Sequence, residues 1–212
     1  MGTTEEPTGP EQLLVFDVDG VLYHYDRNVR VTTLATTLGV SSGAVQDALF
    51  ASGIEDDGDT GVFGPDEYLA ALSARLGVTV TVDAWVTASA SASSPDFEVL
   101  GLAARACRVA KVAALTNNGA LLKSEAPRIL PELVALVLDR LYVSGEIGLA
   151  KPDPAAYWAV VDGCGFTVDQ AYFVDDSPDN VEGARLAGLT AHHFTSAEGL
   201  ASFLASHALL PA

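Results

Sequence analysis

The pattern of hydrophobic and polar positions changes twice along the chain, near residues 24 and 97. Residues 13–16, LLVF, form a continuous apolar run, which is typical of a strand buried on both faces of a sheet. From about residue 97 onward, strand-like apolar runs alternate with stretches of helical length, and the last pair is LTAHHF and EGLASFLASHALL. Strands that alternate with helices predict a parallel sheet covered on both faces. We therefore expect an α/β protein with a Rossmann-like core.

The chain between about residues 24 and 96 interrupts this alternation. Four stretches in it predict short helices, and none shows strand alternation: VRVTTLATTLG, SSGAVQDALFAS, PDEYLAALSARLG and VDAWVTASASA. The polar, glycine-rich GIEDDGDTGVFG between the second and the third predicts a loop. The SASASS run at 89–94 indicates a helix end or a hinge. We interpret 24–96 as a helical cap inserted into a core of residues 11–23 and 97–212, and 1–10 as a disordered tail.

Polar side chains gather where the predicted strands end. Because the carboxyl ends of parallel strands form one edge of a sheet, we expect these residues to share a ligand crevice. Several carboxylates can coexist there if a divalent cation lies among them, and oxygen ligands suit Mg²⁺. Magnesium with a lysine, a threonine hydroxyl and backbone N–H groups makes a phosphate site. In chain order the residues are Asp17, Asp19, Thr116, Asn117, Asn118, Lys151, Asp175 and Asp176.

Composition and charge argue against some classes of binding partner and indicate a cellular compartment. The 212 residues are 49% hydrophobic and 18% charged, as expected for a globular chain that forms a core. The formal charge of −17 argues against nucleic acid and anionic membranes as partners. The two cysteines lie outside any CxxC pattern and are expected to be free thiols. Without an apolar leader or a membrane-length apolar segment, we expect a cytoplasmic monomer or homodimer.

Four motifs in this order resemble the haloacid dehalogenase-like hydrolase superfamily over about residues 13–195. They are DVDGVL, ALTNNG, GLAKPDPAAY and YFVDDSPDNVEGARLAG. The helical block between the first two resembles the small helical cap at the first insertion site of that family. The resemblance implies an Mg²⁺-dependent phosphomonoester hydrolase that acts on a small phosphorylated metabolite through an aspartyl phosphate. Small sugar-phosphate phosphatases, and the phosphatase domain attached to epoxide hydrolases, look most similar.

The resemblance also implies catalytic roles for three residues. Asp17 would be the nucleophile that attacks phosphorus. Asp19 would be the general acid for the leaving oxygen and then the base for the hydrolytic water. Lys151 would neutralise the nucleophile and the transferred group. Spacing alone does not decide which of the two aspartates attacks.

The binding roles that the resemblance implies fall on the remaining motif residues. Asp176 would bind Mg²⁺ together with the carboxylate of Asp17 and the main-chain carbonyl of Asp19. Asp175 would support this ligand set or bind the ion through water. Thr116 and the N–H of Asn117 would hold the phosphoryl oxygens.

Other functions share parts of this pattern. Haloacid dehalogenases of the superfamily replace the second aspartate by a non-acidic residue, so Asp19 favours phosphoryl transfer. A sugar phosphomutase keeps both aspartates and is the main alternative, although it would need basic cap residues. The candidates Arg27, Arg30 and Arg75 are expected to be solvated surface groups. A signalling receiver domain would carry its acidic pair after the first strand, whereas here the pair DD comes last, which argues against this class. A non-catalytic phosphate-binding protein would not need an intact acid, nucleophile and lysine, so their presence favours an enzyme.

The residues that select the substrate are expected in the cap. Tyr25, Phe50, Phe63 and Tyr68 are candidates to line a substrate pocket, although core packing is the expectation for most of them. Trp85 is expected to pack between helices.

Overall fold

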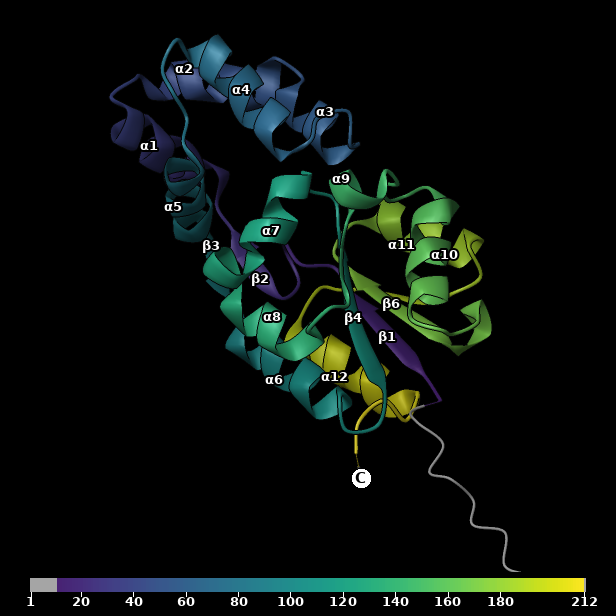
Figure 1. Ribbon diagram of the computed structural model, residues 1–212. Coiled ribbons are helices and arrows are strands. Elements are labelled where there is room, and N and C mark those ends of the chain that lie inside the picture. Colours follow the sequence, from purple (N-terminus) through teal and green to yellow (C-terminus); the bar gives the residue numbers. More distant parts are fainter. Residues whose placement is uncertain (1–10, 212) are drawn as a thin grey trace, which may run out of the picture.

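A five-stranded parallel sheet forms the centre of the fold (Figure 1). The computed structural model describes residues 11–211. In spatial order the strands are β5 (Leu141–Val143), β4 (Lys111–Thr116), β1 (Leu13–Phe16), β6 (Ala171–Asp175) and β7 (Thr190–His193). All paired strands run the same way, so the residues that follow β1, β4 and β6 lie at one edge. The predicted α/β, Rossmann-like core is confirmed.

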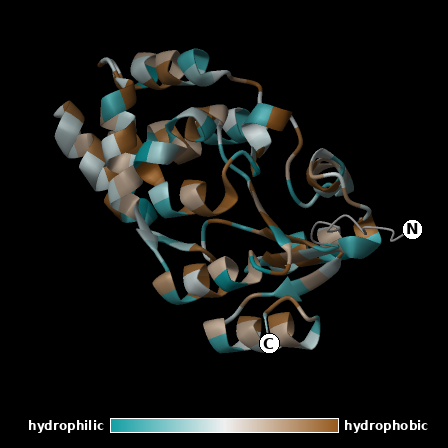
Figure 2. Ribbon diagram, turned by 60° about the horizontal axis from the view of Figure 1, so that its bottom comes forward, coloured by the Kyte–Doolittle hydropathy of each residue, from teal (hydrophilic) through white to brown (hydrophobic). Residues whose placement is uncertain are grey.

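Both faces of the sheet are buried, which explains the uninterrupted apolar run of β1. Leu14 and Phe16 point into one hydrophobic cluster, whereas Leu13 and Val15 point into another, because side chains alternate along a strand. Figure 2 shows this hydrophobic strand layer between the helices. The first cluster packs against α6 (Phe97–Ala106), α8 (Pro131–Val137) and α12 (Ala197–Ser206), and the second against α10 (Pro154–Gly163) and α11 (Pro178–Leu186).

Short polar side chains begin the two helices that follow the site loops. Asp153 accepts a hydrogen bond from the N–H of Ala155 at the start of α10, where Pro154 is the first helical residue. Ser177 caps α11 by accepting from the N–H of Asn180. These caps define where the loops before the helices end.

The segment between Tyr25 and Ser93 forms a helical layer beyond the carboxyl edge of the sheet (Figure 1). Two short strands, β2 (Tyr23–Tyr25) and β3 (Ser93–Pro95), pair antiparallel where this helical insertion leaves and rejoins the core. Between them lie α1 (Arg27–Leu38), α2 (Ser42–Gln46), a π-helical turn (Asp47–Ala51), α3 (Ile54–Asp59), α4 (Pro65–Leu76) and α5 (Val82–Ala92). The core also contains α7 (Ala120–Ile129), α9 (Ser144–Ile147) and a 3₁₀ turn (Val168–Gln170).

The helical insertion meets the core through glycine backbones. A Cβ atom added to Gly145, after β5, would lie 2.4 Å from the carbonyl oxygen of Gly58 in α3. Gly119, after β4, also lies against Gly58. A side chain at position 145 would prevent this approach, so Gly145 lets the insertion come close to the end of β5, while Gly119 and Gly58 are in ordinary contact.

The insertion differs from the sequence prediction in two places. The stretch predicted as a loop contains α3, whose first turn carries Glu55, Asp56 and Asp57. Acidic side chains stabilise a helix N-terminus, and Glu55 is also held by Arg30 from α1, a contact that no local pattern reveals. The strands β2 and β3 are too short to show alternation. The SASASS run spans the end of α5 and the start of β3, as predicted for a helix end.

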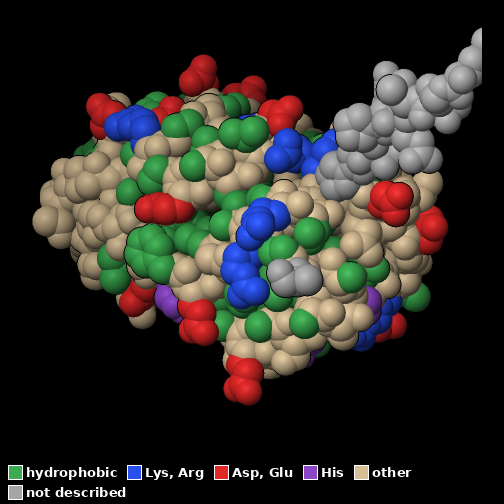
Figure 3. Space-filling model, turned by 90° about the horizontal axis from the view of Figure 1, so that it is seen from below, with side chains coloured by type: hydrophobic (Ala, Val, Ile, Leu, Met, Phe, Trp, Pro, Cys, Tyr) green, Lys and Arg blue, Asp and Glu red, His purple; other side chains and the backbone are tan. Residues whose placement is uncertain are grey.

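The remaining sequence predictions concern the surface and the termini. Figure 3 shows acidic side chains scattered over the surface seen from below in Figure 1, with Lys and Arg side chains gathered between them. Cys107 and Cys164 are free, as predicted. Among residues 11–211, no helix combines the length and the apolar character that crossing a membrane requires. The tail predicted at 1–10 lies outside the described residues.

Candidate active site

The polar residues predicted at the strand ends meet at the carboxyl edge of the sheet, around a buried lysine. The Nζ atom of Lys151 lies 2.7 Å from Oδ1 of Asp17 and 2.7 Å from Oδ2 of Asp175. All three side chains are buried, and Lys151 is only 5% exposed. Asp17 also accepts a hydrogen bond from the N–H of Val18, at 2.7 Å. The lysine therefore bridges carboxylates that follow β1 and end β6.

Burial and charge act in opposite directions on this group. Burial raises the pKa of Asp17 to about 7, although Lys151 lowers it, and Asp175 adds a further rise. Burial by itself would lower the pKa of Lys151, but Asp17 and Asp175 raise it overall, so the lysine stays charged. One ammonium thus faces more negative charge than it can compensate.

Three carboxylates are placed to receive a cation. One ligand oxygen from each of Asp17, Asp175 and Asp176 lies within 4.8 Å of the others. Burial, followed by the charge of Asp175, raises the pKa of Asp176. Gly20 packs so closely on Asp176 that an added Cβ would lie 2.2 Å from Oδ2, which puts the backbone of the turn after Asp19 beside this group. An all-oxygen donor set of this kind fits Mg²⁺.

Asp175 is held in place from several sides. Its Oδ1 accepts from the N–H of Ser177 at 2.8 Å, and the side-chain amide of Asn180 lies 3.1 Å from both of its carboxylate oxygens. With Lys151 on Oδ2, the carboxylate is fully enclosed. Asn180 had no predicted role, although it lies inside the YFVDDSPDNVEGARLAG motif.

The end of β4 and the residues just after it contact both Asp19 and the loop that carries Lys151. The hydroxyl of Thr116 accepts a hydrogen bond from Nδ2 of Asn118 at 2.9 Å, and the same Nδ2 lies 3.3 Å from Oδ2 of Asp19. The side chain of Asn117 bonds the backbone of Lys151 in both directions, through its Nδ2 at 2.8 Å and its Oδ1 at 2.9 Å. This pair ties the lysine loop to the end of β4. Asn118 was not assigned a role from the sequence, although it lies in the TNNG motif.

Asp19 lines a small cavity together with Arg30 and Trp85 of the helical insertion. Burial raises its pKa, while the hydrogen bond from Asn118 and the charges of Arg30 and Lys151 lower it. A carboxyl with a raised pKa is suited to donate a proton.

Arg30 corrects a sequence expectation. The residue was expected to be solvated, but it is 6% exposed and inside the helical insertion. Its guanidinium donates to Glu55 at 2.9 and 3.1 Å, because α3 brings this glutamate over α1. Arg27 and Arg75 are exposed, as expected.

Known proteins resemble this chain in sequence and in fold. A family model described as haloacid dehalogenase-like hydrolase matches residues 11–188. Phosphatase MT3486 from Mycobacterium tuberculosis (strain CDC 1551 / Oshkosh) is 43% identical over 84 residues. That match covers 39% of this chain and 37% of the phosphatase, so the chain aligns with little more than a third of this relative.

Solved structures with a similar fold cover most of the chain. HAD family enzyme bt-2542 from Bacteroides thetaiotaomicron, in complex with magnesium and inorganic phosphate, has a TM-score of 0.72 at 21% identity, over 87% of this chain and 94% of that chain. L-2-haloacid dehalogenase from Xanthobacter autotrophicus, with chloropropionic acid covalently bound, has a TM-score of 0.57 at 21% identity, over 94% and 84%. With the family model matching most of its length, the chain belongs to the haloacid dehalogenase-like hydrolases.

Proposed function

We propose that the chain is an Mg²⁺-dependent phosphomonoester hydrolase that acts on a small phosphorylated metabolite, with a sugar phosphate as the candidate, through an aspartyl phosphate. The observation that carries this proposal is the contact of Lys151 with both Asp17 and Asp175 at 2.7 Å, beside Asp176. The match to a phosphatase and the magnesium and phosphate bound in a structural neighbour support it.

Asp17 is the nucleophile in this proposal. Its carboxylate attacks phosphorus, a P–O bond forms, and the bond to the leaving oxygen breaks. The contacts of Oδ1 with Lys151 and with the N–H of Val18 hold the carboxylate in one orientation. Lys151 also faces the charge that develops on the transferred group, which lowers the barrier in a site that excludes water. Thr116 and the N–H of Asn117 would bind the phosphoryl oxygens.

Asp19 transfers the proton. Its raised pKa lets it protonate the leaving oxygen, after which its carboxylate takes a proton from the water that cleaves the aspartyl phosphate. Asn118 orients it through Nδ2. Magnesium, when bound by Asp17, Asp176 and the main-chain carbonyl of Asp19, would neutralise charge on the phosphoryl oxygens, and Asp175 would support this ligand set.

The helical insertion acts as the cap in this proposal. Residues 24–96 would close over the cleft of the core formed by 11–23 and 97–212, and would exclude bulk water. The close approach of Gly58 and Gly145 supports a closed position of this kind. The intact Asp19 favours this activity over carbon–halogen cleavage.

The test is release of inorganic phosphate from sugar phosphates, nucleotides and p-nitrophenyl phosphate, with Mg²⁺ and with a chelator. We expect turnover that needs the metal and disappears in Asp17→Asn. Asp139→Asn is a matched control, because this aspartate is exposed and precedes β5 at the opposite edge of the sheet. Full activity of Asp17→Asn, or no release by a folded wild type, would contradict the proposal.

Asp19→Asn tests the general-acid role when the first step, phosphoryl transfer to Asp17, is measured in a single turnover. In this step we expect alkyl esters to lose far more rate than p-nitrophenyl phosphate, because an aryl oxide leaves without a proton. An equal loss in the first step for both ester types would contradict the role of Asp19 as general acid.

A further inference from the structure

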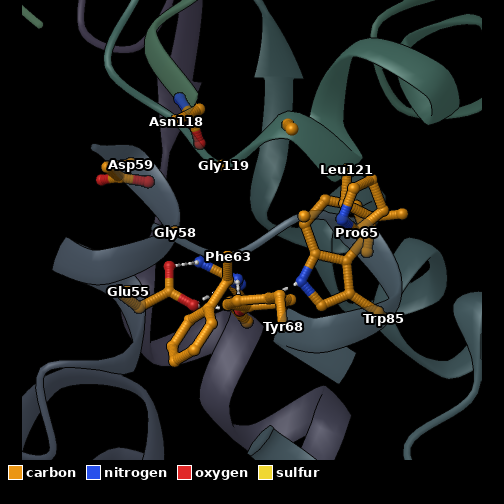
Figure 4. A pocket seen from close by; sticks show the side chains of 13 residues that line it. Glu55, Gly58, Asp59, Phe63, Pro65, Tyr68, Trp85, Asn118, Gly119 and Leu121 are labelled. Carbon is orange, nitrogen blue, oxygen red and sulfur yellow. Dashed lines mark hydrogen bonds and ion pairs between the residues drawn. The ribbon is translucent and has the colours of Figure 1, made fainter. Parts of the chain in front are cut away.

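The face formed by α6 and α8 leaves apolar side chains uncovered within residues 11–211, unlike the inside of the helical insertion. There, beside a small cavity, the hydroxyl of Tyr68 is hydrogen-bonded to both Glu55 and Trp85 (Figure 4). Between α6 and α8 a groove of about 420 Å³ is open to solvent. Its apolar lining consists of Phe97, Leu100, Gly101, Ala104, Ala135 and Leu136. Phe97 is 70% exposed, and an exposed aromatic side chain beside an apolar groove is typical of a surface that another molecule covers.

Gly101 lines this groove from the middle of α6. Its position is exposed, and a Cβ atom added to it would meet nothing within 4 Å among residues 11–211. Packing inside the chain therefore does not require a glycine here, although glycine weakens the interior of a helix relative to alanine. Gly101 and Ala104 lie almost one turn apart and leave space for a second helix to approach closely, because the side chains at a contact set the distance between two helices.

The exposed side chains of α6 carry opposite charges near its two ends. Glu98 lies in the first turn and Arg105 in the last, and neither forms an ion pair within residues 11–211. Seven positions are close to two turns of a helix, so the two side chains lie on the same side of α6. A two-fold axis that crosses α6 between them would therefore place Glu98 of one copy beside Arg105 of another, and the reverse. Glu132, the charged residue of the groove lining, instead accepts a hydrogen bond from the hydroxyl of Tyr23 at 2.8 Å.

A second copy of the chain fits this face. The formal charge of −17 makes two copies repel each other in most orientations, whereas pairing of the α6 ends brings opposite charges together. The same two-fold axis passes close to Gly101, where the two helices can approach. Phe97 lies about one turn before Gly101, so the rotation carries it to the last turn of the other α6, where Ala104 lines the groove. One rotation thus accommodates the glycine, the aromatic side chain and both charges, as an interface between identical faces requires.

We propose that α6 and α8 form the interface of a homodimer, in which the two α6 helices pack antiparallel about a two-fold axis near Gly101. Phe97 of each copy enters the groove of the other, and Glu98 of each copy pairs with Arg105 of the other. Neither helix supplies a residue to the carboxylate group around Lys151, so this interface is additional to the proposed function and does not depend on it.

Sedimentation velocity tests the oligomeric state. We expect the wild-type chain to sediment as a dimer at about 50 µM, because interfaces of standard size have dissociation constants of about micromolar or below. A wild type that remains a monomer at this concentration would overturn the proposal.

Gly101→Arg tests the position of the axis. Two like charges and two long side chains then meet at the axis, so the variant should be a monomer at about 50 µM. Its circular dichroism should equal that of the wild type, since the new side chain has open space within its own copy. Gly43→Arg is the matched control and should remain a dimer, because Gly43 in α2 is also exposed, with nothing within 4 Å of an added Cβ. A dimer that Gly101→Arg leaves intact, or that both variants disrupt, would overturn the proposal.

Exchange of the two charges tests the antiparallel pairing. Glu98→Arg and Arg105→Glu each set like charges against one another, and each should weaken the dimer by about tenfold or more. The double variant carries both changes in each copy and therefore restores opposite charges, so its dissociation constant should return to near the wild-type value. A double variant as weak as either single variant would overturn the proposal, because a parallel arrangement or an unrelated interface gains nothing from the exchange.

Phe97→Ala tests the side chain that enters the groove. Loss of an aromatic side chain from the centre of an interface should weaken the dimer by about tenfold or more. Leu186→Ala is the matched control and should leave the dimer unchanged, because this side chain is 72% exposed, as against 70% for Phe97, and lies on α11 at the other face of the sheet. Equal dissociation constants for the two variants would overturn the role of Phe97 and the proposed packing with it.

Discussion

Lys151→Met removes the ammonium that joins Asp17 to Asp175 and keeps most of the side-chain volume. In the wild type both contacts are 2.7 Å long, and the two carboxylates are 7% and 0% exposed. Removing one partner of a buried ion pair costs about 3–5 kcal/mol, since the remaining charge stays buried without compensation. In a chain of this size that loss corresponds to a fall in Tm of about 6–20 °C.

The size of this loss should depend on pH. Burial already raises the pKa of Asp17 to about 7, and Lys151 works against that rise, so the variant should have a still higher value. A carboxyl whose folded pKa lies above its unfolded value destabilises the fold increasingly as pH rises from the unfolded toward the folded pKa. The free energy of unfolding should therefore fall more in the variant at about pH 8 than at about pH 5.5.

Denaturant unfolding in a chelator measures both effects without interference from bound metal. Arg128→Met is the control for an exposed ion pair, because Arg128 and its partner Asp83 are 49% and 82% exposed, and such a pair contributes about 0–1 kcal/mol. A loss below about 1 kcal/mol in Lys151→Met, or a loss of the same size at both pH values, would refute the reasoning.

Three further predictions follow from the site. Gly20→Ala should weaken Mg²⁺ binding by about tenfold or more in calorimetry, because its Cβ would displace Asp176 and its φ of 86° favours glycine; an unchanged affinity would contradict this role. The apparent Kd for Mg²⁺ should rise about tenfold per pH unit below 7 and level off above it, because a proton competes for Asp17; a Kd independent of pH from about 5 to 7 would contradict it. Gly145→Ala should lower kcat/KM, because its Cβ would meet the carbonyl of Gly58 and keep the insertion from closing, and unchanged kinetics would mean that closure does not need this contact.

The order of helices and strands in the core could be predicted from the sequence. A buried parallel strand must be apolar on both faces, and the run at β1 has this property, with Leu14 and Phe16 on one side and Leu13 and Val15 on the other. Helix starts were equally visible, because Asp153 and Pro154 act on their own helix. Such local signals fail where an element is short or is held by a distant residue, as in α3.

That the carboxylates would meet could also be predicted from the sequence, because they follow or end predicted strands and parallel strands end at one edge, whereas Lys151 was predicted in a loop before a helix. Asp17, Lys151 and Asp175 meet although up to 158 residues separate them, the difference between positions 17 and 175. What the sequence left open was which oxygen contacts which partner. The two contacts of Lys151, and the enclosure of Asp175, depend on the packing of several elements at once.

The sequence by itself determined the α/β architecture and the group of carboxylates with its lysine, since strand patterning and strand-end motifs act through local periodicity and topology. Only the tertiary structure decided the environment of Arg30 and Glu55. The sequence predicts Arg30 at the surface of a helix and Glu55 in a loop. Their pairing needs α1 and α3 to pack together, and within residues 11–211 that packing leaves Nε of Arg30 buried without a hydrogen-bond partner.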